Sequence, residues 1–300
     1  MSTGPEQLRL FDDPSARPGP AGPAPGPVRL GRMEVHVGTS GYSFPDWRGR
    51  FYPRGLKPRA ELGYYATRFP AVELNFTHYR PPTAAALAAM RERTPPGFRF
   101  VVKLHRFLTH EWEAAAPEEL AARAREFAAA LSPLREAGRL AAVLAQFPGR
   151  FQDGPAARAH LARLRELLPA DPLVVEFRHR SWSGAAVGEF LARAGLIPCA
   201  VDEPELPELL PRQAPQTRAG GGLFYLRLHS RDAAKWYAGG AARYEYNYSD
   251  AELAEWVARL GALAESVPAG WVFFNNCARA QAAENAARFI SLLQAAGEKR

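Results

Sequence analysis

Four charged side chains interrupt apolar runs of the sequence, where a charge is energetically costly. Glu73 lies in AVEL, Lys103 in FVVKL, Glu176 in LVVEF and Arg227 in FYLRLH. A buried charge must be paired or must face a wet cavity. One polar pocket explains four such charges most economically, and a purely structural salt-bridge plug is the alternative. The pattern therefore predicts a site with carboxylates for acid–base chemistry and cations for binding an anion.

Further polar and aromatic residues follow the ends of these and similar runs and complete a candidate site. The residues to which we assign catalytic roles are Glu73, Glu176, Lys103, His179 and Asp202. The candidate substrate-binding residues are Ser40, Tyr42, Asn75, Tyr79, His105, His110, Gln146, Arg178, Trp182, Arg227, His229, Asn275 and Asn276.

Two further chemistries stay open for this set. Carboxylates and imidazoles could hold a divalent metal, as in barrel nucleases and isomerases. Lys103, Arg178 and Arg227 oppose a second cation and suit a phosphate or carboxylate instead. A pair of carboxylates across a barrel mouth also suits glycoside hydrolysis.

Short apolar runs alternate with helical patterns along the chain, which predicts the elements that position these residues. The runs are nearly continuously apolar, as is typical of parallel strands buried on both faces. The eight predicted strands are residues 34–39, 71–77, 99–104, 140–147, 173–178, 197–202, 223–229 and 271–275. The predicted helices are residues 59–69, 83–93, 117–137, 155–168, 184–194, 203–210 (the weakest), 250–266 and 278–295.

The lengths of the connections favour a closed (β/α)₈ barrel of the TIM type over a doubly wound open sheet. Connections from helix to strand are short and marked by Pro and Gly, whereas residues 40–58, 105–116 and 230–249 are long loops after strands. In a barrel such loops gather at the face that carries the chemistry.

Several short motifs occur in order at these positions. They are GTSGY at 38–42 with Trp47 and FYP at 51–53, VELN at 72–75, FVVK at 100–103 with Thr109-His110, QFP at 146–148, EFRH at 176–179 with Ser181-Trp182, and FFNN at 273–276. Together they resemble the YecE-like family, the domain of unknown function 72. The resemblance covers about Val35 to Leu293, and it implies a TIM-type barrel with a polar site at the strand ends but no settled reaction. The family usually has His-Gly after the arginine of the seventh strand, where this chain has His229-Ser230.

The first 32 residues are predicted to be a flexible tail in front of a single barrel of residues 33–300. Residues 12–32 are rich in Pro, Gly and Ala and cannot build a core. Before them, the segment QLRLF at 7–11 resembles the peptide by which bacterial replication and repair proteins bind the sliding clamp. Gln7, Leu8, Leu10 and Phe11 would make the contacts, and a chance match is the alternative.

Composition limits the class of protein. No apolar run approaches the roughly 18 residues of a membrane span, and the first residues do not form a secretory signal. Two cysteines are too few for a disulfide framework, so a cytoplasmic protein is expected. The net charge of +7 favours anionic partners such as DNA or RNA, although an arginine-rich composition alone explains it equally well.

The loops after the first and seventh strands interleave basic and aromatic residues, a pattern that suits stacking on bases beside phosphates. The sequence thus favours a hydrolase acting on phosphoester bonds of a phosphate-bearing substrate, with nucleic acid and DNA repair foremost. A non-catalytic nucleic-acid or partner-binding module is the alternative from another class. A glycoside hydrolase or an enzyme of small phosphorylated metabolites is the third.

Overall fold

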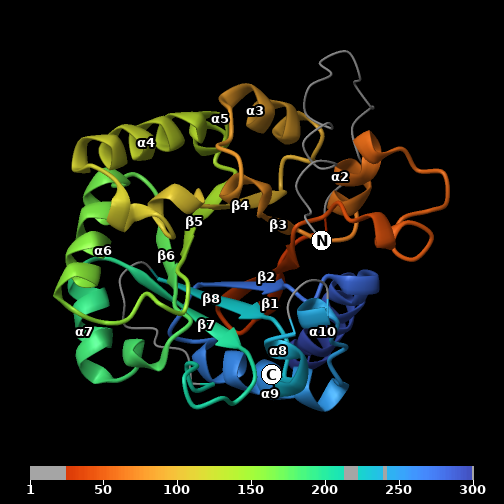
Figure 1. Ribbon diagram of the computed structural model, residues 1–300. Coiled ribbons are helices and arrows are strands. Elements are labelled where there is room, and N and C mark those ends of the chain that lie inside the picture. The colour runs from red at the N-terminus through yellow and green to blue at the C-terminus, as the bar shows by residue number, and fades with distance from the viewer. Residues whose placement is uncertain (1–24, 213–221, 239–241, 299–300) are drawn as a thin grey trace.

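The computed structural model describes residues 25–212, 222–238 and 242–298, and these form a closed barrel. Figure 1 shows the strands at the centre and the helices around them. Neighbouring strands pair in parallel in the order of the chain, and β2 pairs with β9 to close the ring. The barrel strands are β2 (Met33–Ser40), β3 (Ala71–Leu74), β4 (Arg99–Lys103), β5 (Leu140–Gln146), β6 (Leu173–Glu176), β7 (Ile197–Asp202), β8 (Leu223–Leu228) and β9 (Ala269–Phe274).

The predicted (β/α)₈ barrel and its eight parallel strands are confirmed. The largest difference at a strand end concerns residues 75–77, which were expected to continue the second strand. Phe76–His78 instead form a 3₁₀ turn, so the backbone leaves the barrel directly after Leu74.

The sheet includes residues that precede the predicted domain boundary at Met33. Strand β1 (Val28–Leu30), which the sequence analysis placed in the tail, pairs antiparallel with β2. Gly31 takes a φ of +57° in the turn between them, and Leu30 and Met33 are fully buried. The Pro- and Gly-rich composition of residues 12–32 predicted a flexible tail. The strand β1 has only three residues, and the glycine turn is enough to pair it with β2.

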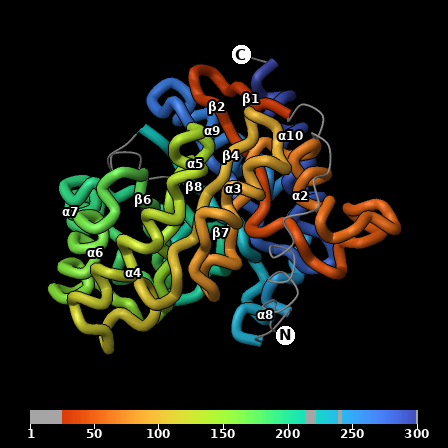
Figure 2. Tube along the Cα trace, turned by 90° about the horizontal axis from the view of Figure 1, so that it is seen from above, coloured from red at the N-terminus to blue at the C-terminus, as the bar shows by residue number. Residues whose placement is uncertain are grey.

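Helices surround the barrel in Figure 1, and Figure 2 shows α6 and α7 on one side of the molecule and α2 and α10 on the other. Thr83 and Ser249 cap the N-termini of α3 and α9 through their side chains, and Gly184 occupies the N-cap position of α7. The helices are α2 (Pro58–Ala66), α3 (Ala84–Glu92), α4 (Pro117–Ala130), α5 (Ser132–Glu136), α6 (Pro155–Leu167), α7 (Ala185–Arg193), α8 (Ala233–Trp236), α9 (Asp250–Leu263) and α10 (Gln281–Gly297).

Proline accounts for two differences from the predicted helices. The helix expected over 117–137 is divided at Leu131 into α4 and α5, because Pro133 has no N–H to continue the hydrogen-bond ladder. The prediction of a weak helix over 203–210 was wrong. This segment forms turns, because Pro204 and Pro207 each remove a backbone donor.

The core has two layers, separated by the barrel wall. Alternate strand residues such as Val101, Leu144 and Cys199 fill the barrel, and their neighbours pack outward against the helices. Strand parity therefore decides whether a polar residue near a strand end enters the barrel or lies beneath a helix.

The long connections follow the carboxyl ends of β2, β4 and β8, and because the strands are parallel, these loops meet at one face. Among the described residues, no helix is long and apolar enough to span a membrane. The tail residues Gln7, Leu8, Leu10 and Phe11 lie outside the described residues, and clamp binding stays a prediction.

The capping box of α9 offers a test of the fold. Ser249 Oγ accepts from Glu252 N, and the Glu252 carboxylate accepts in turn from Ser249 N at 2.8 Å. Ser249→Ala should lower the free energy of unfolding by about 1 kcal/mol, measured by urea denaturation. The matched control is Ser291→Ala on an exposed face of α10, which should change it by less than about 0.5 kcal/mol. Equal losses in the two variants would contradict the capping role.

Candidate functional site

Arg227 on β8 is the centre of a polar layer inside the carboxyl end of the barrel. Its Nη1 donates to Glu176 Oε2 at 2.6 Å, and its Nη2 donates to Glu73 Oε1 at 2.8 Å. Ser40 Oγ on β2 lies 3.4 Å from the same Nη2. One guanidinium therefore joins strands on opposite sides of the barrel, as its rigid fork allows.

The two carboxylates on Arg227 are fully buried, so each needs its ion-pair partner. Glu73 Oε2 accepts a second hydrogen bond, from Tyr225 OH at 2.7 Å. Burial alone would raise the pKa of Glu176, but Arg178 and Arg227 outweigh it and hold that pKa well below the usual range. Glu176 is thus an anion tied to two cations rather than a free proton donor.

Arg178, directly above this layer, links Glu176 to a third carboxylate. Its Nη2 forms an ion pair with Glu176, and its Nη1 donates to Glu203 Oε2 at 2.8 Å. Burial raises the pKa of Glu203 to about 7, although Arg178 opposes the shift. Glu203 Oε1 is buried and has no hydrogen-bond partner in the described part of the chain.

Glu203, like Trp236 and Arg243, was not among the predicted site residues. It follows the inward residues Ile197, Cys199 and Val201 of β7 at the same two-residue spacing. That parity was the available signal, but it is hidden where a strand is apolar on both faces.

Lys103 on β4 supplies a second group that titrates near neutrality. Its Nζ donates to Gln146 Oε1 on β5 at 2.7 Å. Burial, followed by the positive charge of Arg227, lowers the pKa of Lys103 to about 7. The nearby Glu176 and Glu73 oppose this shift without cancelling it.

His229 and Asn275 extend the layer on the side of β8 and β9. The His229 ring is buried, with Nε2 2.9 Å from Arg178 Nη2 and Nδ1 2.9 Å from Asn275 Nδ2. Burial and the charge of Arg178 lower the pKa of His229 well below its ordinary value, so the ring is neutral.

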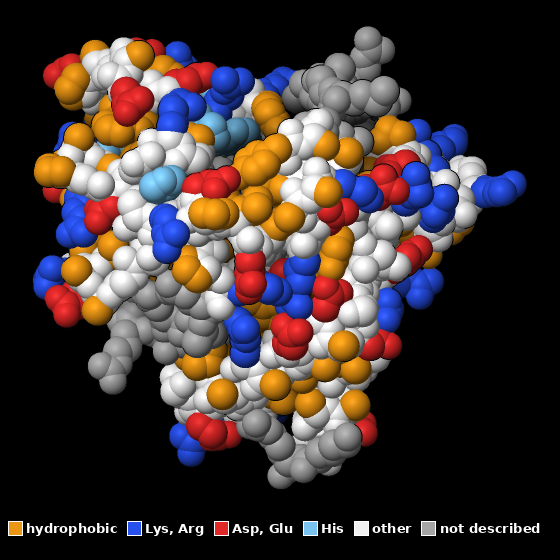
Figure 3. All heavy atoms as spheres, turned by 60° about the horizontal axis from the view of Figure 1, so that its bottom comes forward, with side chains coloured by type: hydrophobic (Ala, Val, Ile, Leu, Met, Phe, Trp, Pro, Cys, Tyr) orange, Lys and Arg blue, Asp and Glu red, His pale blue; other side chains and the backbone are white. Residues whose placement is uncertain are grey.

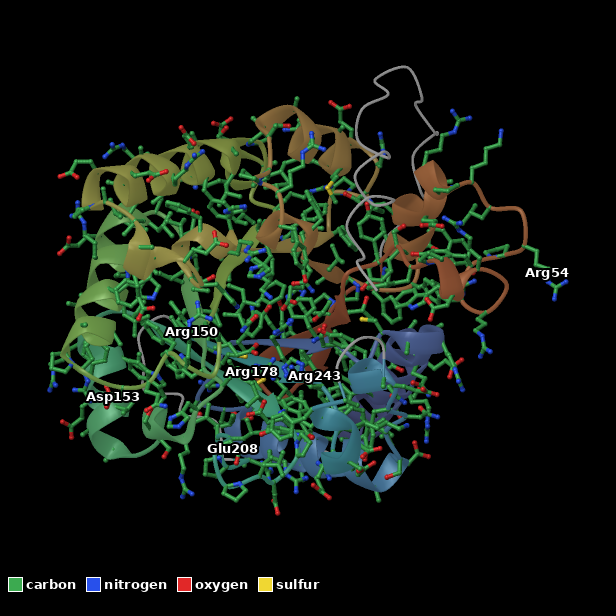
Figure 4. All side chains as sticks on the ribbon, in the orientation of Figure 1. Arg54, Arg150, Asp153, Arg178, Glu208 and Arg243 are labelled. Atoms are coloured by element: carbon green, nitrogen blue, oxygen red, sulfur yellow. The ribbon has the colours of Figure 1, made fainter. Side chains whose placement is uncertain are left out.

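The loop after β8 covers this layer with one aromatic side chain between two cations. Trp236 is buried, and the guanidinium carbons of Arg243 and Arg178 lie 4.0 and 5.5 Å from its ring centroids. Figure 4 shows Arg178 and Arg243 close together near the barrel centre. Arg243 has no ion-pair partner among the described residues, so a positive charge remains at the mouth.

Several predicted binding residues lie on the rim at β3 and β4. Asn75 Oδ1 is buried without a hydrogen-bond partner in the described residues, and Tyr79 is 60% exposed. His105 caps a 3₁₀ turn by accepting from Phe107 N. The His110 ring packs edge-on against that of His78, and burial with the Lys103 charge lowers the pKa of His110 to about 4.

Asp202, predicted as catalytic, lies on the outer side of β7. Arg231 binds both its oxygens at 3.0 and 2.8 Å, and Trp256 Nε1 and Tyr248 OH also donate to it. Its parity is opposite to that of Glu203, and its acceptor sites are occupied. It joins the loop after β8 to α9 and is absent from the layer around Arg227.

Four other predicted site residues occupy packing positions. His179 accepts from Ser181 N and lies in a 3₁₀ cap, while Trp182 stacks on Phe177 with ring centroids 4.1 Å apart. Tyr42 is buried beside Tyr65 in the outer core. Asn276 donates to Tyr246 O and to Asn285 Oδ1, both at 2.7 Å, beneath α10. The structure does not bring these four to the central layer.

Within the described ranges, no group of three or more His, Cys, Asp or Glu side chains is arranged to hold a metal ion. Glu73, Glu176 and Glu203, the inward carboxylates, are each bound by an arginine. The donor set fits an anion better than a divalent cation.

Comparison with known proteins places this barrel among proteins of undefined activity. Residues 36–300 match the family described as "Protein of unknown function DUF72". The UPF0759 protein YunF of Bacillus subtilis (strain 168) is 28% identical over 271 residues, or 86% of this chain and 94% of that protein.

Two solved structures agree closely in fold. A DUF72 family protein from Thermotoga maritima MSB8 has a TM-score of 0.79 and 40% identity, covering 87% of this chain and 99% of that one. A second, from Enterococcus faecalis V583, has a TM-score of 0.75 and 27% identity, covering 86% and 95%.

The raised pKa of Glu203 makes a prediction about stability. A carboxyl that is neutral in the folded state until about pH 7, but titrates at 4.5 when unfolded, contributes stability that is fully present below pH 4.5. This stability is lost as the pH rises to 7. Between pH 5 and 8, the protein should lose on the order of 3 kcal/mol relative to Glu203→Gln, measured by urea denaturation. Parallel stability curves for the two proteins would rule out the raised pKa.

Proposed function

The chain belongs to the DUF72 family of proteins of unknown function, and we propose that it is an enzyme that acts on an anionic, phosphate-bearing substrate by general acid–base catalysis. The reaction would take place at the carboxyl end of the barrel, above Arg227. The proposal rests on the chemistry of the described side chains.

The observation that carries the proposal is the pair Glu203 and Lys103. Their pKa values both lie at about 7, from opposite directions, because burial disfavours the charged form of each. A proton-transfer group works best when its pKa lies near the operating pH. At neutrality either group can give or take a proton with little change in free energy.

The balance of fixed charge supports an anionic substrate. Glu73 and Glu176 share Arg227, and Arg178 bridges Glu176 to Glu203. Arg243 and the charged form of Lys103 remain without a carboxylate partner in the described residues. A phosphate group bound by either cation would gain charge-assisted hydrogen bonds in a site of low dielectric constant.

The other polar residues receive positioning roles in this proposal. Arg227, with Glu73 and Glu176, fixes the floor of the site, and Arg178 orients the Glu203 carboxyl. Asn75, whose Oδ1 is free of protein partners in the described residues, would accept from a substrate hydroxyl or amine. Asn275 would orient substrate beside His229.

A phosphodiester in nucleic acid is one member of this substrate class, and a small phosphorylated metabolite is another. The proposal of a nuclease related to DNA repair draws on the basic charge of the chain and on the clamp-binding pattern at Gln7–Phe11. Its support is therefore weaker than the support for acid–base chemistry.

Glycoside hydrolysis is the second candidate, favoured by one observation. Glu176 and Glu203 share Arg178, yet one pKa is lowered and the other raised. A glycosidase needs such a division between a charged nucleophile and a protonated acid. The Glu176 oxygens face Arg178 and Arg227, however, which leaves the nucleophile less available.

A substrate panel tests the proposal and separates these candidates. We expect turnover of an aryl phosphate or phosphodiester, with kcat/KM in a bell-shaped pH profile centred near pH 7. Glu203→Gln and Lys103→Met should each lower kcat/KM by about 100-fold or more and remove one limb of the bell. The matched control is Glu205→Gln, an exposed carboxylate paired with Arg212, which should keep the activity of the unmodified chain.

Turnover of aryl glycosides but not of phosphate esters would transfer the proposal to glycoside hydrolysis. Tight binding of phosphate esters without any product would favour a non-catalytic binding module. Full activity in both site variants would contradict the assigned proton-transfer roles.

A further inference from the structure

The loop between β2 and α2 concentrates positive charge at a place that the proposed active site does not use. Between positions 48 and 59 the chain carries five cations and no acidic residue, a local charge of +5 within a total of +7. All five side chains are exposed. They are Arg48, Arg50, Arg54, Lys57 and Arg59.

Buried aromatic residues hold this loop in place. Trp47 is fully buried and donates from Nε1 to Cys277 O at 2.7 Å. Tyr52 is 1% exposed, and its hydroxyl donates to Tyr42 O. Between them the chain makes a tight turn in which Gly49, with a φ of +78°, donates to Tyr52 O at 2.8 Å. The cations thus stand on an anchored turn.

Only one of the five cations has a carboxylate partner in the part of the chain that the structure describes. Arg48 lies 3.1 Å from buried Glu61, which also accepts from Ser43. Elsewhere in this arginine-rich protein, exposed arginines such as Arg123 and Arg163 pair with acidic residues along their own helices. The remaining four cations of the loop are therefore available to an external anion.

The loop also has a shape that an anion can enter. A hollow of about 570 Å³ is lined by Arg48, Gly49, Arg50, Arg54 and Gly55. Figure 4 shows Arg54 on a loop that projects away from the barrel, far to the side of Arg178 and Arg243. Figure 3 shows Lys and Arg side chains at the same edge of the molecule. This surface is separate from the site around Arg227.

We propose that the loop at residues 48–59 binds the phosphate backbone of double-stranded nucleic acid without reading its sequence. Guanidinium groups match phosphate geometry, and several exposed arginines on one turn can neutralise successive phosphates. The binding does not depend on what the barrel catalyses.

The burial of the aromatic residues selects the duplex over a single strand. Sequence analysis expected these aromatics to stack on bases, but Trp47 and Tyr52 are inside the protein. Single-strand binding sites combine cations with exposed stacking surfaces, whereas a duplex offers its backbone alone. A membrane surface is disfavoured as well, because the loop exposes no large hydrophobic side chain to insert.

Fluorescence anisotropy with a labelled 20-base-pair DNA duplex and the full chain tests this proposal. We expect binding at 50 mM salt that weakens steeply as salt is added. Arg50→Ala/Arg54→Ala should weaken it at least 10-fold and make the slope of log K against log salt shallower by about 2. Arg125→Ala/Arg193→Ala, which removes the same charge from exposed positions on α4 and α7, should leave both quantities nearly unchanged.

The outcomes separate this proposal from the proposed function. Lys103→Met should bind the duplex like the unmodified chain even if it has lost all turnover. Equal weakening by the loop variant and the charge-matched control would overturn the proposal, as would no duplex binding at 50 mM salt. Preference for a single strand of the same length, or for vesicles containing anionic lipid, would also overturn it.

Discussion

The polar end of the barrel depends on one guanidinium group shared by two buried carboxylates. Without Arg227, Glu73 would be a buried charge with no ion-pair partner in the described residues, and Glu176 would keep only Arg178. Leaving a buried charge unpaired costs several kcal/mol, so these residues must be kept or replaced together. Because they come from β3, β6 and β8, the same contact fixes the relative position of three strands. These ion pairs form the floor of the proposed reaction site.

The arginine ion pairs explain why the pKa values of Glu176, Glu203 and Lys103 shift differently. Glu176 is held as an anion by two arginines, whereas Glu203 shares only one of these and stays near its point of half-protonation at neutral pH. Lys103 lies where Arg227 repels its charge, and its pKa falls toward the same value. Burial would disfavour charge at all three positions, so the number and sign of the neighbouring charges decide which group can exchange a proton. The positively charged mouth, with Arg243 against Trp236, then selects for an anion.

The sequence was sufficient to predict the eight barrel strands and the central charges, although not the short strand β1. Glu73, Lys103, Glu176 and Arg227 stand out because a charge in an apolar run has few explanations, and all four do lie inside the barrel end. The choice between Asp202 and Glu203 could not be made in the same way. Both end the same strand, and only the register of β7 shows that Glu203 faces inward while Asp202 lies beneath α9. His179 and Trp182 were attractive by type, but local capping and stacking occupy them. Trp236 reaches the site through a loop whose path no periodicity describes.

The central claim is that the Glu203 carboxyl exchanges a proton near neutral pH while the neighbouring Glu176 carboxylate stays charged. The ¹³C chemical shift of the Glu203 side-chain carboxyl, assigned by its disappearance in Glu203→Gln, measures this directly across a pH titration. The account predicts a midpoint near pH 7 for Glu203, while the Glu176 carboxyl stays ionised down to well below pH 4.5. A Glu203 midpoint at the ordinary value near 4.5 would contradict the account, because no carboxyl in the described site would then be poised for proton transfer.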